Sequence, residues 1–189
     1  MVIDGSACLL MALLLLTVPL PWVGAALLAA AFHELCHWAA LRCFGISVRR
    51  LQLGAGGAVM ETDPMEPRQE LWSAVAGPAG SLGLLLLIRH CPRIAVCGGI
   101  QGIFNLLPVY PMDGGRILLC LLKFRCSEQK ARNLCRFAEN LTLGASLLAG
   151  MVLSFGYIMG IAPVLMAVTM VMKAKMRKIP CKEPFQRVQ

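Results

Sequence analysis

Residues 20–45 read LPWVGAALLAAAFHELCHWAALRCFG, an apolar stretch with two histidines and a glutamate past its middle. The apolar character already begins near Gly5, so one helix over Gly5–Gly45 would be about 60 Å long at about 1.5 Å per residue. The hydrocarbon core of a bilayer is only about 30 Å thick. Because Pro19-Leu20-Pro21 marks a turn, the sequence predicts two membrane spans here, Ser6–Val18 and Trp22–Phe44.

The composition of the whole chain agrees with a membrane protein. Of its 189 residues, 58% are hydrophobic and 15% are charged, and the mean hydropathy is +0.70. Soluble domains have about 45–50% apolar and about 25% charged residues, so a soluble enzyme and a disordered chain are excluded. The nine cysteines are odd in number and lie mostly in apolar runs, which excludes a disulfide scaffold.

Further apolar segments bring the prediction to about six spans. The third is Leu71–Ile88 and the fourth is Ile94–Met112. The fifth begins near Leu134, a turn near residues 154–156 follows it, and the sixth is Tyr157–Met172. The predicted fold class is therefore an all-α integral membrane protein.

One segment between the second and third spans departs from the helical pattern. Residues 46–61 read ISVRRLQLGAGGAVME, in which two alternating stretches flank a glycine-rich turn. This pattern predicts a short β-hairpin or a re-entrant strand pair after the second span.

Basic residues separate by side in the six-span arrangement. Sixteen Lys and Arg side chains fall on the side of both termini, and only Arg89 and Arg93 fall on the other. The positive-inside rule then places both termini in the cytoplasm of a multi-pass cell-membrane protein. This topology explains the net charge of +8, so no nucleic-acid partner is expected. Residues 1–172 form one membrane domain, and 173–189 form a basic cytoplasmic tail that can touch lipid.

The motif His33-Glu34-Leu35-Cys36-His37 is an H-E-x-x-H sequence inside a predicted span. Residues i and i+4 share a helix face, so His33 and His37 can donate to one metal ion. Glu34 sits beside that face, where a carboxylate can take a proton from water and pass it to a leaving amine. Two histidines bonded only to backbone are the alternative, but titratable groups inside a membrane need a strong partner.

Asp113 is the best candidate for a third ligand. It lies in NLLPVYPMDGGR (105–116), where Pro108 and Pro111 break the helix and Gly114-Gly115 allow an unusual backbone. A catalytic zinc usually has three protein ligands and one open position. The alternative for Asp113 is a helix N-cap, where Asp is favoured, and the spacing alone leaves both open.

Two other side chains could complete the site. Cys36 lies inside the motif, although a packing role suits it better because two histidines and a carboxylate suffice. Glu139 lies near the cytoplasmic interface, where a side chain can reach water instead.

Together, H-E-x-x-H in an early span and N-x-x-P-x-x-P-x-D-G-G in a later one resemble the site-2 protease family of intramembrane zinc metalloproteases. Ala76-Gly77-Pro78 is also similar to that family, and the resemblance covers about residues 20–125. It implies one Zn²⁺ per chain. The roles that it implies are zinc ligands His33, His37 and Asp113, general acid and base Glu34, and substrate or oxyanion binding by Asn105.

Within the family, the short six-span plan is most similar to the sporulation stage IV branch, which cuts a membrane-associated pro-sigma factor. One departure concerns the Gly-Pro motif, which commonly continues to an Asn, whereas this chain has Ser81. By analogy, the Gly54–Gly57 hairpin could pair with an unwound substrate strand. A simple interfacial hairpin is the alternative.

The leading functional prediction is an intramembrane zinc endopeptidase. It would hydrolyse a peptide bond in or beside the membrane segment of a protein substrate, such as a pro-sigma or anti-sigma factor, under control of a membrane partner. The alternatives are a polytopic metal transporter or sensor and an inactive scaffold of the same family. A transporter would usually show a repeat or a polar path, which the sequence lacks. The intact Glu34 argues against a scaffold.

Overall fold

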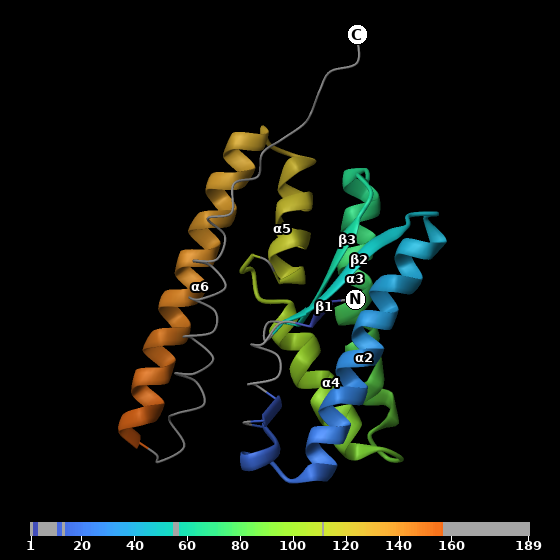
Figure 1. The fold of residues 1–189 in the computed structure, drawn as a ribbon. Coiled ribbons are helices and arrows are strands. Elements are labelled where there is room, and N and C mark those ends of the chain that lie inside the picture. Colours follow the sequence, from blue (N-terminus) through green and yellow to red (C-terminus); the bar gives the residue numbers. More distant parts are fainter. Residues whose placement is uncertain (1, 4–10, 13, 55–56, 111, 157–189) are drawn as a thin grey trace. The chain divides into compact units, whose positions relative to one another are not determined.

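The structure is a computed structural model and describes residues 2–3, 11–12, 14–54, 57–110 and 112–156 (Figure 1). The chain divides into two compact units, Met1–Thr142 and Leu143–Gln189, and the features that follow lie in the first, apart from the later turns of α6 (Glu128–Gly156). The described residues are mostly helical, as the sequence predicted. The sixth predicted span, the basic tail and residues 6–10 and 13 of the first span lie outside the described residues.

Helix α2 (Leu20–Cys43) carries the H-E-x-x-H motif and corresponds to the second predicted span. It begins directly after Pro19, with Pro21 in the first turn, where a missing N–H leaves no helical hydrogen bond unmade. It ends before Gly45, whose φ of 71° is a conformation that glycine adopts readily. His33 and His37 both lie on its buried face.

Helices α3 (Pro67–Gly83) and α4 (Pro92–Asn105) pack closely against each other. A short 3₁₀ turn, η1 (Leu84–Leu87), extends α3. Glycines on α4 allow this approach: a Cβ built on Gly98 would lie 2.7 Å from a methyl group of Leu84. Small residues at such contacts are a common device of membrane helices.

Helix α4 is shorter than the predicted span Ile94–Met112, which was wrong at its end. The helix stops at Asn105, and the described residues that follow, 106–110 and 112, form an irregular connection. Pro108 accounts for this, because it lacks the N–H that a continuing helix would need.

Helix α5 (Asp113–Lys123) follows that connection and packs on α3. The sequence suggested an unusual backbone at Gly114-Gly115, but neither residue has a positive φ. Among the described glycines, Gly45 alone has one. The role of Gly114 and Gly115 is close approach instead. A Cβ on Gly114 would overlap the carbonyl of Leu106, and a Cβ on Gly115 would lie 2.6 Å from the backbone nitrogen of Tyr110. The connection can therefore fold back over the first turn of α5.

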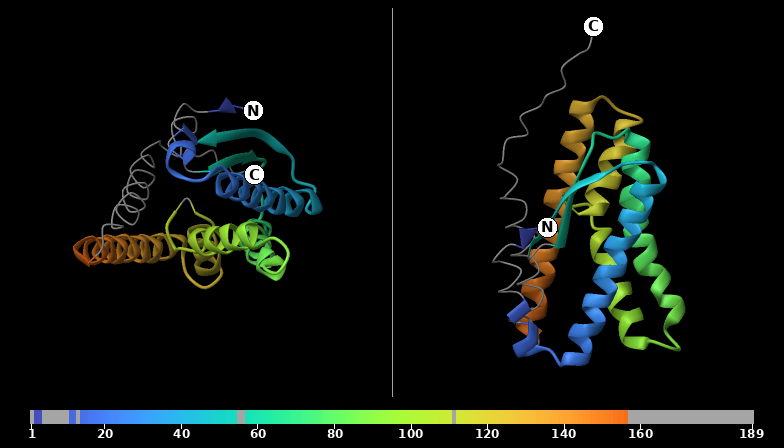
Figure 2. Two further views of the ribbon diagram at one scale, coloured as in Figure 1. Left: turned by 90° about the horizontal axis from the view of Figure 1, so that it is seen from below. Right: turned by 45° about the vertical axis from the view of Figure 1, so that its right-hand side comes forward.

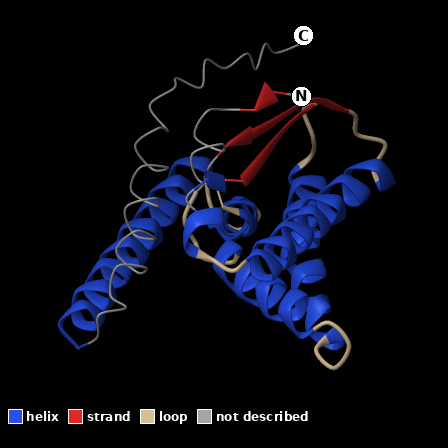
Figure 3. Cartoon of the chain, turned by 60° about the horizontal axis from the view of Figure 1, so that its bottom comes forward, coloured by secondary structure: helices blue, strands red, loops and turns tan. Residues whose placement is uncertain are grey.

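Three strands form a small sheet in the order β1-β2-β3. Strands β2 (Val48–Gly54) and β3 (Gly57–Thr62) pair antiparallel, in the segment where the sequence predicted strand pairing. Strand β1 (Val2–Ile3) pairs parallel to β2, with Val2 opposite Gln52. Figure 2 shows the sheet on one side of α2 and the helices α4 and α5 on the other. Figure 3, where strands are red, shows the strands lying side by side.

Helix α6 (Glu128–Gly156) begins earlier than the fifth predicted span, which was placed from about Leu134. Its first turns are polar, and an Arg132–Glu128 ion pair of 2.7 Å supports them at i,i+4 spacing. The apolar pattern therefore missed the start of this helix.

Two described helical segments are long and apolar enough to cross a membrane, Leu20–Cys43 and Pro67–Leu87. The second contains most of the third predicted span. The distribution of apolar and titratable side chains between surface and interior also favours a membrane protein. Large apolar side chains such as Leu86 and Ile100 are exposed, whereas His33 and Asp113 are buried. Apolar residues outside and titratable residues inside are typical of a protein in lipid.

Candidate metal centre

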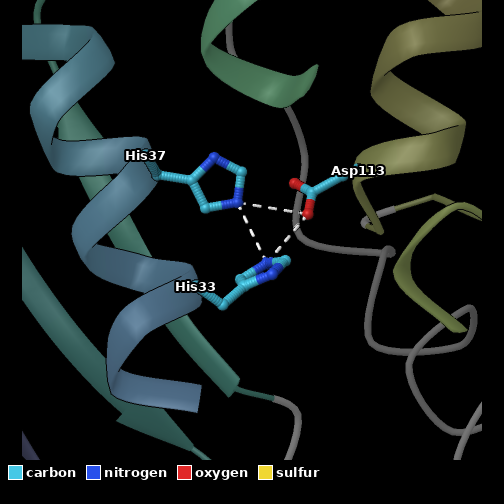
Figure 4. A group of neighbouring side chains, drawn as sticks. All are labelled: His33, His37 and Asp113. Carbon is cyan, nitrogen blue, oxygen red and sulfur yellow. Dashed lines mark hydrogen bonds and ion pairs between the residues drawn. The ribbon is translucent and has the colours of Figure 1, made fainter. Parts of the chain in front are cut away.

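Three buried side chains meet between α2 and the start of α5 (Figure 4). The Nε2 atoms of His33 and His37 lie 3.1 Å apart, and each lies 3.1 Å from Oδ2 of Asp113. The exposed fractions of the three residues are only 2%, 7% and 7%. The structure thus joins two motifs that lie 76 residues apart in the sequence.

The local backbone explains how each side chain reaches this point. His33 and His37 are one turn apart on α2, so both rings point the same way. Asp113 is the first residue of α5, and the N-cap position belongs to Met112. The side chain of Asp113 turns to the histidines, so the N-cap alternative does not describe it.

The ring of His37 is held in one orientation by α3. Its Nδ1 donates a hydrogen bond of 2.7 Å to the backbone carbonyl of Ser73. A carbonyl can only accept, so in the neutral ring the proton lies on Nδ1 and the lone pair of Nε2 faces the site. Gly77, one turn further along α3, leaves room for the ring, because a Cβ there would overlap it.

The ring of His33 has a matching contact. Its Nδ1 lies 2.8 Å from Oγ of Ser81, which can accept the ring proton. The side chain of Ser81 is fully buried, at 0% exposure. Ser81 stands where the Gly-Pro motif commonly has an Asn, and it still supplies a hydrogen-bonding group to His33.

The donor set fits a zinc ion. Zinc bound at about 2.0–2.1 Å in a tetrahedral site separates neighbouring ligand atoms by about 3.3 Å, close to the 3.1 Å measured here. With both Nδ1 atoms donating outward, the centre contains two nitrogen lone pairs and a carboxylate oxygen. Three acceptors at this distance repel one another unless a cation lies among them. Two histidines and one carboxylate are a common ligand set of catalytic zinc.

The two Nε2 atoms and Oδ2 of Asp113 form a triangle, and Asn105 and Glu34 lie beside it. Asn105 ends α4, and its Nδ2 lies 3.5 Å from Nε2 of His33. Glu34 is half-buried on α2, and its charge interacts with the ring of His37. Both predicted catalytic side chains therefore adjoin the group that could hold the metal.

The two other candidate ligands are not part of this group. Cys36 packs against α3, where a Cβ on Gly80 would overlap its sulfur. Glu139 is buried on α6. Among the described residues, the group with converging ligand atoms is His33, His37 and Asp113 alone.

Sequence reasoning missed the contribution of α3. Ser73 was not singled out, Gly77 was named only as part of a family motif, and Ser81 was treated only as a departure from that motif. A usable signal was present, because residues 73, 77 and 81 recur at four-residue spacing and share one helix face. Small and polar residues in such a row inside an apolar span indicate contact with something polar.

Comparisons with known proteins agree with this geometry. No protein-family model matches the chain. A site-2 protease structure from Methanocaldococcus jannaschii is similar, with a TM-score of 0.67, 21% identity and coverage of 95% of this chain and 89% of that one. The chain has the site-2 protease fold.

Curated proteins with similar sequences are named zinc metalloproteases. One from Methanocaldococcus jannaschii is 32% identical over 108 residues, which cover 50% of this chain and 32% of that protein. Another, Rip3 of Mycobacterium tuberculosis, is 32% identical over 120 residues, which cover 52% of this chain and 30% of that protein. The match thus spans about a third of the length of these relatives.

Proposed function

We propose that this protein is an intramembrane zinc endopeptidase of the site-2 protease type. The observation that carries the proposal is the 3.1 Å triangle of His33, His37 and Asp113 inside an apolar helical chain. The relatives named zinc metalloproteases and the site-2 protease fold support the same family-level assignment. One zinc ion per chain would occupy the triangle.

His33, His37 and Asp113 would hold the zinc ion, and three protein ligands would leave room for a reacting group. A zinc ion in such a site lowers the pKa of water and polarises a carbonyl group. Glu34, next to the ligand face of α2, is placed to take a proton from the attacking water and to give it to the leaving amine. Burial of the site excludes bulk water, which strengthens each of these interactions.

Asn105 has a binding role in this proposal. Its side-chain amide lies at the edge of the triangle, where it can donate a hydrogen bond to the substrate carbonyl. The carbonyls of a helical substrate are already hydrogen-bonded, so the segment to be cut must unwind first. The β2–β3 pair offers a sheet to which such an extended strand could add.

The setting of the protein is part of the proposal. We place it in the cell membrane as a multi-pass protein with both termini in the cytoplasm. The partition of sixteen to two basic residues and the two apolar helices of sufficient length support this. The substrate is then a membrane-associated protein. The narrower hypotheses of a pro-sigma or anti-sigma factor and of a regulatory membrane partner rest on the resemblance of the motifs.

Zinc removal and return test the proposed function. The full chain is reconstituted in vesicles with two single-pass reporter proteins, one with glycine and proline in its membrane helix and one with a poly-leucine helix. Cleavage of the first reporter is expected, with loss on chelation and recovery on addition of Zn²⁺. The poly-leucine reporter should resist cleavage because its helix does not unwind.

Two results would count against this assignment. Cleavage that a chelator leaves unchanged would contradict a zinc enzyme. Zinc flux across the vesicle membrane without cleavage of the reporter would favour the transporter alternative.

A further inference from the structure

The carboxylate of Asp113 has a second oxygen, and it faces a charged pair. Its Oδ1 lies 3.8 Å from Nη1 of Arg116, one turn further along α5. Nε of the same guanidinium lies 3.8 Å from Oε1 of Glu70 on α3. Arg116 therefore stands between two carboxylates and meets each with a different nitrogen.

These charges are partly shielded from water. The side chains of Arg116 and Glu70 are 28% and 32% exposed, and that of Asp113 is 10% exposed. Charges in such places interact more strongly than charges on an open surface. The planar guanidinium also has a fixed set of donors, so it can restrain the direction of both partners, which a lysine ammonium does less well.

Glu70 also interacts with a second side chain of α5, Cys120. This thiol is buried on α5, one turn beyond Arg116, and interacts with the carboxylate of Glu70. Burial and the nearby charge of Glu70 raise the pKa of Cys120 to about 11. The thiol thus stays protonated beside Glu70 and adds no negative charge there.

Glu70 also belongs to the face of α3 that serves the two histidines. Residue 73 is three positions after residue 70, and residue 81 is eleven positions after it. Eleven residues make about three helical turns, so all three lie on one side of the helix. Ser73 contacts His37 and Ser81 contacts His33. One face of α3 therefore reaches both histidines directly and reaches Asp113 through Arg116, although α3 itself supplies no ligand.

We propose that Arg116 and Glu70 are positioning residues that hold Asp113 with Oδ2 directed at the two histidines. Both oxygens of a free carboxylate are equivalent, so the side chain needs a restraint to present one of them at a fixed point. Arg116 forms an ion pair with Oδ1, and Glu70 forms an ion pair with Arg116. This inference rests on the metal site described under the proposed function. Partners of this kind commonly change metal affinity by about 10- to 100-fold.

Zinc affinity in single and double variants tests the inference. Zinc dissociation constants are measured by chelator competition on the purified full chain in detergent. Arg116→Gln is expected to weaken binding about 10-fold, and Glu70→Gln is expected to weaken it less. Because Glu70 acts through Arg116, the double variant should bind no more weakly than Arg116→Gln. Arg116→Lys, which keeps the charge but not the planar donors, should fall between wild type and Arg116→Gln.

A spectroscopic readout separates positioning from a general loss of packing. The visible spectrum of the Co²⁺-loaded chain reports the geometry of the ligands, and it should change in Arg116→Gln. The matched control is the exposed Arg132–Glu128 pair on α6, with side chains 45% and 60% exposed. Arg132→Gln and Glu128→Gln should alter neither the zinc affinity nor the Co²⁺ spectrum.

Several results would overturn the inference. Wild-type zinc affinity and Co²⁺ spectrum in Arg116→Gln would show that Asp113 needs no such support. Fully additive losses in the double variant would show that Glu70 does not act through Arg116. A lower unfolding temperature with an unchanged Co²⁺ spectrum would make the pair a packing feature. Absence of zinc from the wild type would instead refute the proposed function itself.

Discussion

Replacing Glu34 with glutamine is expected to leave zinc bound and to slow peptide cleavage by at least about 100-fold. Glutamine has nearly the same size as glutamate but cannot take a proton from water at neutral pH. Glu34 lies outside the triangle of ligand atoms, so the metal should stay in place. Single-turnover cleavage of the glycine- and proline-containing reporter, with zinc content measured on the same samples, checks both halves of this prediction.

A second glutamate provides the control for this variant. Glu128 lies on the exposed start of α6, and Glu128→Gln makes the same chemical change away from the triangle. It should keep both zinc and activity. Full activity of Glu34→Gln on the same reporter would contradict the assignment of Glu34 as the proton carrier. Loss of zinc together with activity would show that Glu34 supports the metal.

Replacing Gly77 with alanine is expected to abolish tight zinc binding, with a loss of about 100-fold or more in affinity. A Cβ at this position would overlap the imidazole of His37. The ring cannot simply move aside, because Nδ1 is held by the carbonyl of Ser73 and Nε2 belongs to the triangle. The overlap should also lower the free energy of unfolding of the metal-free chain by about 1–3 kcal/mol.

Gly83 is the matched control for this substitution. It lies on the same helix, and a Cβ there would meet nothing within 4 Å. Gly83→Ala should therefore bind zinc like the wild type and should be at least as stable, since alanine favours a helix more than glycine does. Wild-type zinc affinity in Gly77→Ala would show that His37 is free to shift and would contradict the tight packing of α3 on the site.

The sequence was sufficient for the parts of the site that follow from local spacing. The positions of His33 and His37 on one helix face follow from the four-residue interval, and α2 covers nearly the predicted span. Asp113 could be named from the prolines and glycines around it. The sequence could not decide whether Asp113 is a metal ligand or a helix N-cap, because its role depends on which helices pack together.

The remaining features depend on contacts between elements far apart in the chain. Gly114 and Gly115 looked like sites of unusual backbone. Glycine is needed there instead because residues 106–110 fold back over α5 and leave no room for a Cβ. Ser81 looked like a weakened motif, yet it reaches the ring of His33. Arg116 was only one of the sixteen basic residues counted for topology, yet it forms an ion pair with Asp113. No periodicity in a single segment carries this information.

The most direct test of the account is the zinc content of the purified wild type and of Asp113→Ala, measured side by side by elemental analysis. Removal of Asp113 leaves two histidines on one helix, which are too few for a stable zinc site. We expect about one zinc per wild-type chain and clear loss of zinc in the variant. Equal zinc in both proteins would contradict the joining of the two motifs into one site and would direct attention to Glu139 or Cys36.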